Sequence, residues 1–241
     1  MIKCAELSIS FQNKNILKDV TLEVQNHLSI LGANGSGKSS FAKALSGLIE
    51  YDGDITIDSQ NIKTLTPNAR AKLLSYIPTK LELYDTLITV EEFVLLGRFP
   101  YKESLFSYAK KDYDIVKEML EFLSIAHLAK HTLAELSSGE QQLTLIAQAL
   151  AQQSRIIIFD EPTANLDPKN SKIIAEHIKA LKKEHTIILI THDLHLAAFI
   201  DSQVLFIKEK SAKLYDKEFF SDTMLEKLYG VAFSNLAVRY D

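Results

Sequence analysis

The chain has 241 residues, of which 46% are hydrophobic and 24% charged. This is the composition of an ordinary globular protein that can bury a sizeable core. The formal net charge of −4 argues against a nucleic-acid-binding protein, which usually carries a basic face. The single cysteine, Cys4, excludes an internal disulfide and favours a reducing compartment. The sequence shows neither a signal peptide nor an apolar run long enough to span a bilayer, so we expect any membrane association to be peripheral.

Strands and helices are predicted to alternate along most of the chain. The strands are expected at residues 5–11, 20–24, 28–31, 53–57, 74–77, 155–159, 186–190 and 203–207. The helices are expected at about 37–48, 67–74, 89–100, 108–125, from 138 onward, 170–183 and 193–200. Short β-rich runs that alternate with helices predict a buried parallel sheet. The long helical stretch in the middle predicts an insert in this α/β core, at roughly residues 80–150.

The segment "GANGSGKSS" links a predicted strand to a predicted helix and has the spacing Gly32-x-x-x-x-Gly37-Lys38-Ser39. Glycines let several backbone N–H groups turn toward one anion, and the helix N-terminus adds partial positive charge. Lys38 is expected to reach the β- and γ-phosphates of a nucleotide, and Ser39 to ligate Mg²⁺. The alternative, a Gly/Ser-rich turn that only caps a helix, is disfavoured by the strand–loop–helix context. The expected nucleotide-binding residues of this phosphate loop are Gly32, Ala33, Asn34, Gly35, Ser36, Gly37, Lys38, Ser39 and Ser40.

Two further strand ends carry polar side chains. Asp160 and Glu161 follow the apolar run "RIIIF", and His192 follows "TIILI". Beside a phosphate loop, Asp160 is suited to hold Mg²⁺, Glu161 to polarise the attacking water and His192 to donate a hydrogen bond near the γ-phosphate. The plainer alternatives are solvent-facing carboxylates and an exposed or structural histidine.

The loop "LSSGEQQ", residues 136–142, opens a predicted helix. A helix N-terminus of this kind is a possible second anion site. From the residues alone, we favour a simpler structural role in which Ser138 is the N-cap and Gln141 or Gln142 is its capping-box partner.

Together, these segments resemble the ATP-binding subunit of an ABC transporter. The resemblance covers essentially the whole chain and rests on "GANGSGKS" as Walker A, "LSSGEQ" as the signature, "IIIFDEP" as Walker B, "ANLD" as the D-loop and "THD" as the switch histidine. It implies an α/β fold with a P-loop NTPase core, a parallel sheet, an N-terminal antiparallel β subdomain and a helical insert. The implied division of the single domain, 1–241, is a core at about 1–79 and 151–241 and a helical subdomain at about 80–150.

The resemblance also implies a mechanism with ATP and Mg²⁺ as cofactors. Glu161 and His192 would be catalytic, and Ser39 and Asp160 would hold the metal. Two subunits would pair head to tail, so that the signature of one contacts ATP bound to the other; its residues are Ser137, Ser138, Gly139 and Glu140. Asn165 and Asp167 of the D-loop would line this interface. Phe11 matches the aromatic position that stacks on adenine, the alternative being an ordinary aromatic at a strand end.

The segment "TVEEFVLLGRFPY" resembles importers for metal chelates such as ferric siderophores, haem, cobalamin or molybdate, as does the C-terminal "MLEKLYGVAF". The alternative is that Gly97 and Pro100 only end a helix. The importer interpretation implies permease subunits as direct partners, an external binding protein as an indirect one, and no nucleic acid. It places the subunit on the cytoplasmic face of the inner (plasma) membrane. Two other functions remain open, an ATP-gated clamp on a non-transport partner and the ATPase of an exporter.

One position departs from the family pattern at the nucleotide edge. Thr79 follows the strand that ends before Pro78, where the family normally has a glutamine that touches Mg²⁺ or the attacking water and senses the transmembrane partner. A threonine keeps a hydroxyl but has a shorter reach, and a water could bridge the difference. Thr79 is therefore an open question as a metal contact. Smaller departures in and after the signature are Ser138, Leu143 and Gln148.

Overall fold

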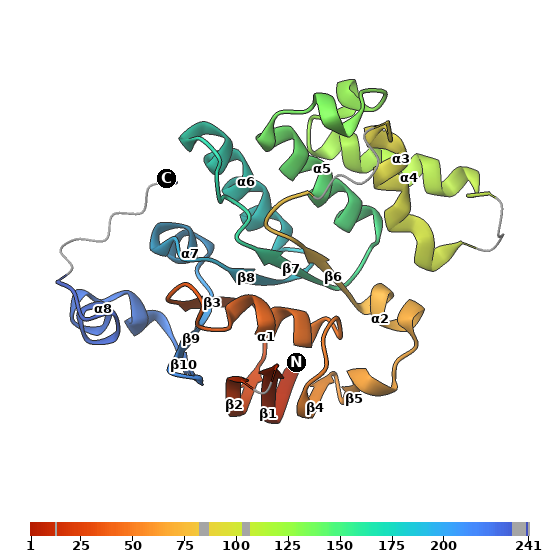
Figure 1. Cartoon of the computed structure of the whole chain (residues 1–241). Coiled ribbons are helices and arrows are strands. Elements are labelled where there is room, and N and C mark those ends of the chain that lie inside the picture. The colour runs from red at the N-terminus through yellow and green to blue at the C-terminus, as the bar shows by residue number, and fades with distance from the viewer. Residues whose placement is uncertain (13, 82–86, 103–106, 233–239, 241) are drawn as a thin grey trace.

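A six-stranded sheet forms the centre of the molecule (Figure 1). The computed structural model describes residues 1–12, 14–81, 87–102, 107–232 and 240. The sheet has the order β10-β9-β3-β8-β7-β6, and every neighbouring pair is parallel except β10 with β9. Its strands are β3 (Leu28–Gly32), β6 (Leu74–Ile77), β7 (Ile156–Asp160), β8 (Thr186–Ile190), β9 (Gln203–Lys208) and β10 (Ser211–Tyr215). The predicted parallel sheet is confirmed.

A second, antiparallel sheet is built from the N-terminal part of the chain. Its order is β2-β1-β4-β5, with β1 (Ile2–Phe11), β2 (Lys14–Val24), β4 (Asp52–Ile57) and β5 (Gln60–Asn61). Along β1, Ile2, Cys4, Leu7 and Ile9 are buried in the core between this sheet and α1. This arrangement confirms the antiparallel β subdomain that the resemblance implied.

Helices cover both faces of the central sheet (Figure 1). The α-helices of the described residues are α1 (Lys38–Leu45), α2 (Pro67–Leu73), α3 (Val90–Leu95), α4 (Lys110–Phe122), α5 (Ser138–Ala151), α6 (Pro168–Leu181), α7 (Leu194–Ile200) and α8 (Asp222–Tyr229); of these, α3 and α4 pack against α5. Successive side chains of a strand point to opposite faces. In β7, Ile158 accordingly packs in the same cluster as Phe41 of α1, whereas Phe159 packs with residues of α5, α6 and α7. Burial on both faces explains why these strands are continuously apolar.

The turn after α3 is held by a buried arginine. The chain continues from α3 as a 3₁₀ helix, Leu96–Tyr101. Arg98 is only 2% exposed; its Nε donates to Asp112 Oδ1 at 2.9 Å and its Nη1 to the Ala151 carbonyl at 2.7 Å. A Cβ on Gly97 would lie 2.2 Å from the Gln148 carbonyl oxygen. Gly97 therefore allows close approach to α5, and the alternative that it only ends a helix is wrong.

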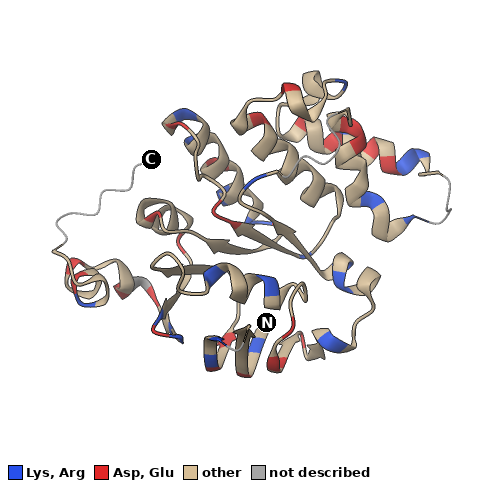
Figure 2. Cartoon of the chain, viewed as in Figure 1, with Lys and Arg blue, Asp and Glu red and all other residues tan. Residues whose placement is uncertain are grey.

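Charged side chains are spread over most of the surface elements but are nearly absent from the central strands (Figure 2). In β3, β6, β7 and β8 the only charged residue is Asp160. Burying a carboxylate is costly unless it is hydrogen-bonded or paired, so this single exception marks the end of β7 as a functional position.

The cysteine is buried, and no membrane-spanning helix is found among the described residues. Cys4 is 2% exposed, and burial raises the pKa of its thiol to about 12. None of the helices in the described part of the chain has the length and hydropathy of a bilayer-spanning segment.

Candidate functional site

The phosphate loop, residues 32–40, leaves the buried strand β3 and enters α1. Gly37 is the N-cap of α1 and has φ 106°, a left-handed value that favours glycine. A Cβ on Gly32 would lie 2.3 Å from the Ile207 carbonyl oxygen, and one on Gly37 would lie 2.8 Å from Ile16 Cγ2. No side chain caps the first turn of α1, and that turn carries no acidic residue. This helix N-terminus is therefore shaped to receive an anion.

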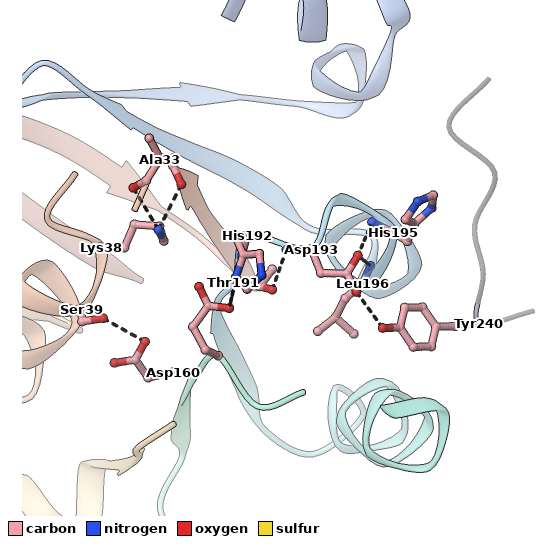
Figure 3. Close-up of polar contacts among 12 residues, drawn as sticks. Ala33, Lys38, Ser39, Asp160, Thr191, His192, Asp193, His195, Leu196 and Tyr240 are labelled. Carbon is pink, nitrogen blue, oxygen red and sulfur yellow. Dashed lines mark hydrogen bonds and ion pairs between the residues drawn. The ribbon is translucent and has the colours of Figure 1, made fainter. Parts of the chain in front are cut away.

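Lys38 is folded back onto the loop (Figure 3). It is 6% exposed, and its Nζ donates to the carbonyl oxygens of Gly32 at 3.0 Å and Ala33 at 3.2 Å. Burial lowers the pKa of Lys38, while the charges of Glu161 and Asp160 act in the opposite direction. The ammonium group is thus hydrogen-bonded to two carbonyl oxygens of the phosphate loop. Phosphate oxygens of a bound nucleotide can replace these carbonyls as its partners.

Asp160 lies opposite the start of α1 and is 3% exposed. Its Oδ1 accepts a hydrogen bond from Ser39 Oγ at 3.0 Å, and its Oδ2 accepts one from Tyr76 Oη at 2.6 Å. The structure therefore brings Ser39 and Asp160 together, and their hydroxyl and carboxylate oxygens are the hard donors that Mg²⁺ takes. The contact of Tyr76 was not predicted from the sequence. Burial, followed by the bond to Asp160, raises the pKa of Tyr76, so its hydroxyl stays a proton donor.

Glu161 and His192 meet because β7 and β8 are parallel neighbours. The ring Nδ1 of His192 lies 2.8 Å from Glu161 Oε2, and the backbone N–H of His192 donates to the same oxygen at 3.3 Å. Glu161 has φ 51°, a left-handed value that is uncommon for a residue with a side chain. Backbone strain of this kind clusters at functional sites. Both side chains lie at the edge where Asp160 ends its strand.

The next residue, Asp193, fixes the turn that follows His192. Its Oδ1 accepts from the backbone N–H groups of His195 at 2.8 Å and Leu196 at 3.2 Å, which makes it the N-cap of α7. Its Oδ2 accepts from Tyr240 Oη at 2.8 Å (Figure 3).

A cavity of about 490 Å³ adjoins the phosphate loop, within the usual size range of small-molecule sites. Its wall includes Phe11, which is 64% exposed. Stacking of Phe11 on adenine stays a prediction. The other residues that line the cavity come from the loop, from β2 and from the β9–β10 turn: Lys14, Asn15, Ile16, Gly35, Ser36, Gly37, Lys38, Ser39, Ser40, Glu209 and Lys210. Five of these residues were not predicted, because only the fold brings them to the loop: Lys14, Asn15, Ile16, Glu209 and Lys210.

The signature segment, residues 136–141, begins α5 with a capping box. Ser137 is the N-cap: its backbone N–H and Oγ donate to Glu140 Oε2 at 2.8 and 2.7 Å, and Glu140 N–H approaches Ser137 Oγ at 3.4 Å. The predicted cap at Ser138, with Gln141 or Gln142 as partner, is wrong. The helix begins at Ser138 as predicted, but its N-cap is Ser137, because Ser137 is the last residue with an extended backbone. The bonds from Ser137 lower the pKa of Glu140.

The signature segment lies beside the D-loop. A Cβ on Gly139 would lie 2.8 Å from Asn170 Cγ, and Asp167 caps α6 by accepting from Asn170 N–H at 2.9 Å. Asn165 is exposed and has φ 64°. In the part of the chain that the structure describes, no hydrogen bond joins residues 136–140 to the phosphate loop. The predicted site residues thus form two groups. One lies around the phosphate loop, and the other consists of the signature segment and the D-loop.

Thr79 is half-buried, directly after β6 and Pro78. It lies at the carboxyl end of the strand next to β7, and that end of the sheet also carries Asp160 and Glu161. Ligands of open α/β sheets bind at this edge. The position agrees with the sequence-based expectation, and the role of Thr79 stays a prediction.

Comparisons with known proteins identify the family. The family model described as "ABC transporter" matches residues 17–164. An uncharacterized ABC transporter ATP-binding protein of Haemophilus influenzae is 34% identical over 87% of this chain and 81% of its own length. The manganese transport system ATP-binding protein MntB of Listeria innocua is 33% identical over 94% of this chain and 95% of its own. A probable iron chelatin transport ATP-binding protein of Helicobacter pylori is 32% identical over 87% of this chain and 84% of its own.

Solved structures agree in fold. An ABC transporter described as of metal-chelate type, in an inward-facing conformation, has a TM-score of 0.83 at 24% identity and covers 96% of this chain and 89% of its own. A dimeric ATP-binding cassette bound to ADP and Pi has a TM-score of 0.78 at 26% identity and covers 90% of this chain and 98% of its own. The chain therefore belongs to the ABC transporter family, as an ATP-binding subunit that hydrolyses ATP.

Proposed function

We propose that this subunit powers the import of a metal chelate, such as a ferric siderophore, haem, cobalamin or molybdate. The convergence of Lys38, Asp160 and the Glu161–His192 pair on one sheet edge supports the ATPase half of the proposal. The import half is supported by relatives that are described as manganese and probable iron chelatin transport proteins. Cargo choice within this class is a property of the permease and the external binding protein.

The phosphates of ATP occupy the phosphate loop in this proposal. Backbone N–H groups at the start of α1 bind them, and Lys38 exchanges its two carbonyl partners for phosphate oxygens. Ser39 and Asp160 hold Mg²⁺, which neutralises charge on the phosphates when it is bound. Phe11 stacks on the adenine at the mouth of the cavity.

Glu161 is the general base for the attacking water. Its carboxylate is 16% exposed and is oriented by His192, so the base is already positioned before nucleotide arrives. His192 donates a hydrogen bond to the γ-phosphate once ATP is bound. Proton transfer by a positioned group contributes about 10²–10⁴-fold to a rate.

Hydrolysis requires a second copy of the chain. The signature residues Ser137 to Glu140 contact the γ-phosphate of ATP in the partner subunit, and Asn165 and Asp167 line the interface. The proposed division is a core at about 1–79 and 151–241, with a helical subdomain at about 80–150. Permease subunits contact the region of Thr79 and α3, on the cytoplasmic face of the inner membrane.

The variant Glu161→Gln tests the catalytic assignment. It keeps the size and the hydrogen-bonding capacity of the side chain but removes the base. We expect hydrolysis to fall by about 10²–10⁴-fold, while ATP stays bound and the dimer accumulates in light scattering. Glu176→Gln, on the exposed part of α6, is the matched control and keeps the wild-type rate. Wild-type hydrolysis by Glu161→Gln would falsify the assignment.

The import proposal is tested by isolating the native complex from detergent-solubilised membranes. We expect a multi-span membrane protein and an external binding protein to accompany the chain. Mass spectrometry and elemental analysis of the bound ligand are then expected to show a metal chelate. Recovery of soluble partners alone would favour a clamp, and loss of efflux rather than uptake in a deletion strain would favour an exporter.

A further inference from the structure

We propose that Tyr76 is a positioning residue for the carboxylate that holds the nucleotide-bound metal. The Tyr76 hydroxyl donates to Asp160 Oδ2 at 2.6 Å, while Ser39 Oγ takes the other oxygen, Oδ1, at 3.0 Å. The inference rests on the proposed Mg²⁺ site at Ser39 and Asp160. It adds a third residue, from a different strand, that sets the orientation of the metal-binding oxygen.

The register of the sheet explains why Tyr76 reaches this carboxylate. Tyr76 on β6 pairs with Ile158 on β7. Asp160 is two residues further along β7, so its side chain lies on the same face as that of Ile158. A tyrosine ring spans this diagonal step and places a donor at its far end. A phenylalanine fills the same space without a donor.

The environment makes the contact strong. Asp160 is 3% exposed, so its carboxylate has little access to solvent, and a bond from a hydroxyl to an ionised acceptor is short and charge-assisted. With Oδ2 held by Tyr76, Oδ1 is directed at Ser39, the other proposed ligand. Hydrogen-bond partners behind a ligating carboxylate typically contribute 10–100-fold to metal affinity.

Metal binding by Tyr76→Phe tests the proposal. The full-length protein is saturated with a non-hydrolysable ATP analogue, and Mn²⁺ binding is followed by loss of the free Mn²⁺ EPR signal, with a protein-free titration subtracted. We expect Mn²⁺ to bind about tenfold more weakly than to the wild type. The affinity for the analogue in EDTA stays unchanged, which shows that the variant is folded and that only the metal step is affected.

Tyr51→Phe is the matched control. The Tyr51 hydroxyl is also buried, but no residue in the described part of the chain bonds to it. Removing it is expected to leave both Mn²⁺ binding and nucleotide binding as in the wild type.

A third variant separates this inference from the proposed metal site. If Asp160→Asn and Tyr76→Phe both weaken Mn²⁺ binding, both assignments hold. Weak binding by Asp160→Asn with wild-type binding by Tyr76→Phe overturns the role of Tyr76 and leaves the site intact. Wild-type binding by Asp160→Asn overturns the site itself. Tighter Mn²⁺ binding by Tyr76→Phe also overturns the inference, because Tyr76 would then compete with the metal.

Discussion

The N-termini of α1 and α5 are both expected to meet phosphate, yet they are built differently. The N-cap of α1 is Gly37, with no side-chain cap and no acidic residue in the first turn. The N-cap of α5 is Ser137, whose hydroxyl and backbone N–H are both engaged by Glu140. The first helix leaves its N-terminal groups to a ligand, whereas the second satisfies its own.

This difference predicts an order of events. A phosphate that approaches α1 meets partial positive charge and no competing carboxylate. A γ-phosphate that approaches α5 meets the Glu140 carboxylate and must compete for the Ser137 hydroxyl. We therefore expect ATP to bind the phosphate loop first. The signature segment then engages only when closure of the dimer compensates for the lost cap.

The largest effect is expected at the α1 end. Lys38→Ala removes the cation that neutralises the phosphates, and loss of one such group costs about 10²–10³-fold in kcat. Steady-state ATPase assays and nucleotide titrations measure the loss. Lys43→Ala, an exposed lysine in the last turn of the same helix, is the control and is expected to match the wild type. Equal losses of ATPase activity in the two variants would mean that the net positive charge of α1, and not the position of Lys38, supports hydrolysis.

An intermediate effect is expected at the α5 end, without nucleotide. Ser137→Ala removes the N-cap and should lower the free energy of unfolding by about 1 kcal/mol. Ser138→Ala removes a neighbouring exposed hydroxyl that is not the cap, so we expect a change within about 0.5 kcal/mol. Urea denaturation of the nucleotide-free protein distinguishes the two. The reverse ranking would show that the cap lies at Ser138 after all.

The contribution of the Glu140 carboxylate to the free energy of unfolding is expected to be smaller and to depend on pH. The bonds from Ser137 hold the pKa of Glu140 below its ordinary value. The stability that the carboxylate contributes is therefore complete above the unfolded pKa, about 4.3, and is lost as the pH falls through the lower folded pKa. The difference in unfolding free energy between wild type and Glu140→Gln should shrink as the pH falls below about 4. A difference that stays constant down to pH 3 would contradict the capping-box assignment.

The smallest effect is expected from Thr79→Gln. Glutamine reaches further than threonine from this end of the sheet, where Asp160 and Glu161 also lie. ATP affinity should stay similar, because Thr79 does not line the cavity beside the phosphate loop, while hydrolysis, or its stimulation by the permease, rises. ATPase assays with and without the permease measure this. Thr79→Val, which removes the hydroxyl at nearly constant size, is the control. No response to either variant would mean that Thr79 is a neutral replacement.

The sequence predicted where the phosphate-loop residues and the strand-end carboxylates lie, because local rules determine their placement. A strand, a glycine loop and a helix fix Lys38 and Ser39, and parallel pairing carries Asp160 and Glu161 to the same edge. The Tyr76–Asp160 bond could not be predicted in this way, because it depends on which strand neighbours β7 and in which register. The cap at Ser137 rather than Ser138 depends on which of two adjacent serines is the last to have an extended backbone.

The fold outside the site likewise has features that local sequence signals do not reveal. The antiparallel strand β10 was not predicted, because its two-residue turn is Glu209–Lys210, with φ values of 52° and 65°. Turns of this conformation usually contain asparagine and glycine, so the usual sequence signal is missing. Likewise, Gly97 was open to interpretation as a helix stop until its contact with the backbone of α5 was known.

The burial of Cys4 has a practical consequence for labelling experiments at the N-terminus of α5. It is the only cysteine of the chain, and with its thiol buried and its pKa at about 12 it presents almost no nucleophilic thiolate at neutral pH. We therefore expect Cys4 to react only slowly with maleimide and thiol-specific spin-label reagents. A Ser138→Cys variant would carry a single reactive thiol within the signature segment. A probe attached there would report dimer closure directly, without any other site having to be removed first.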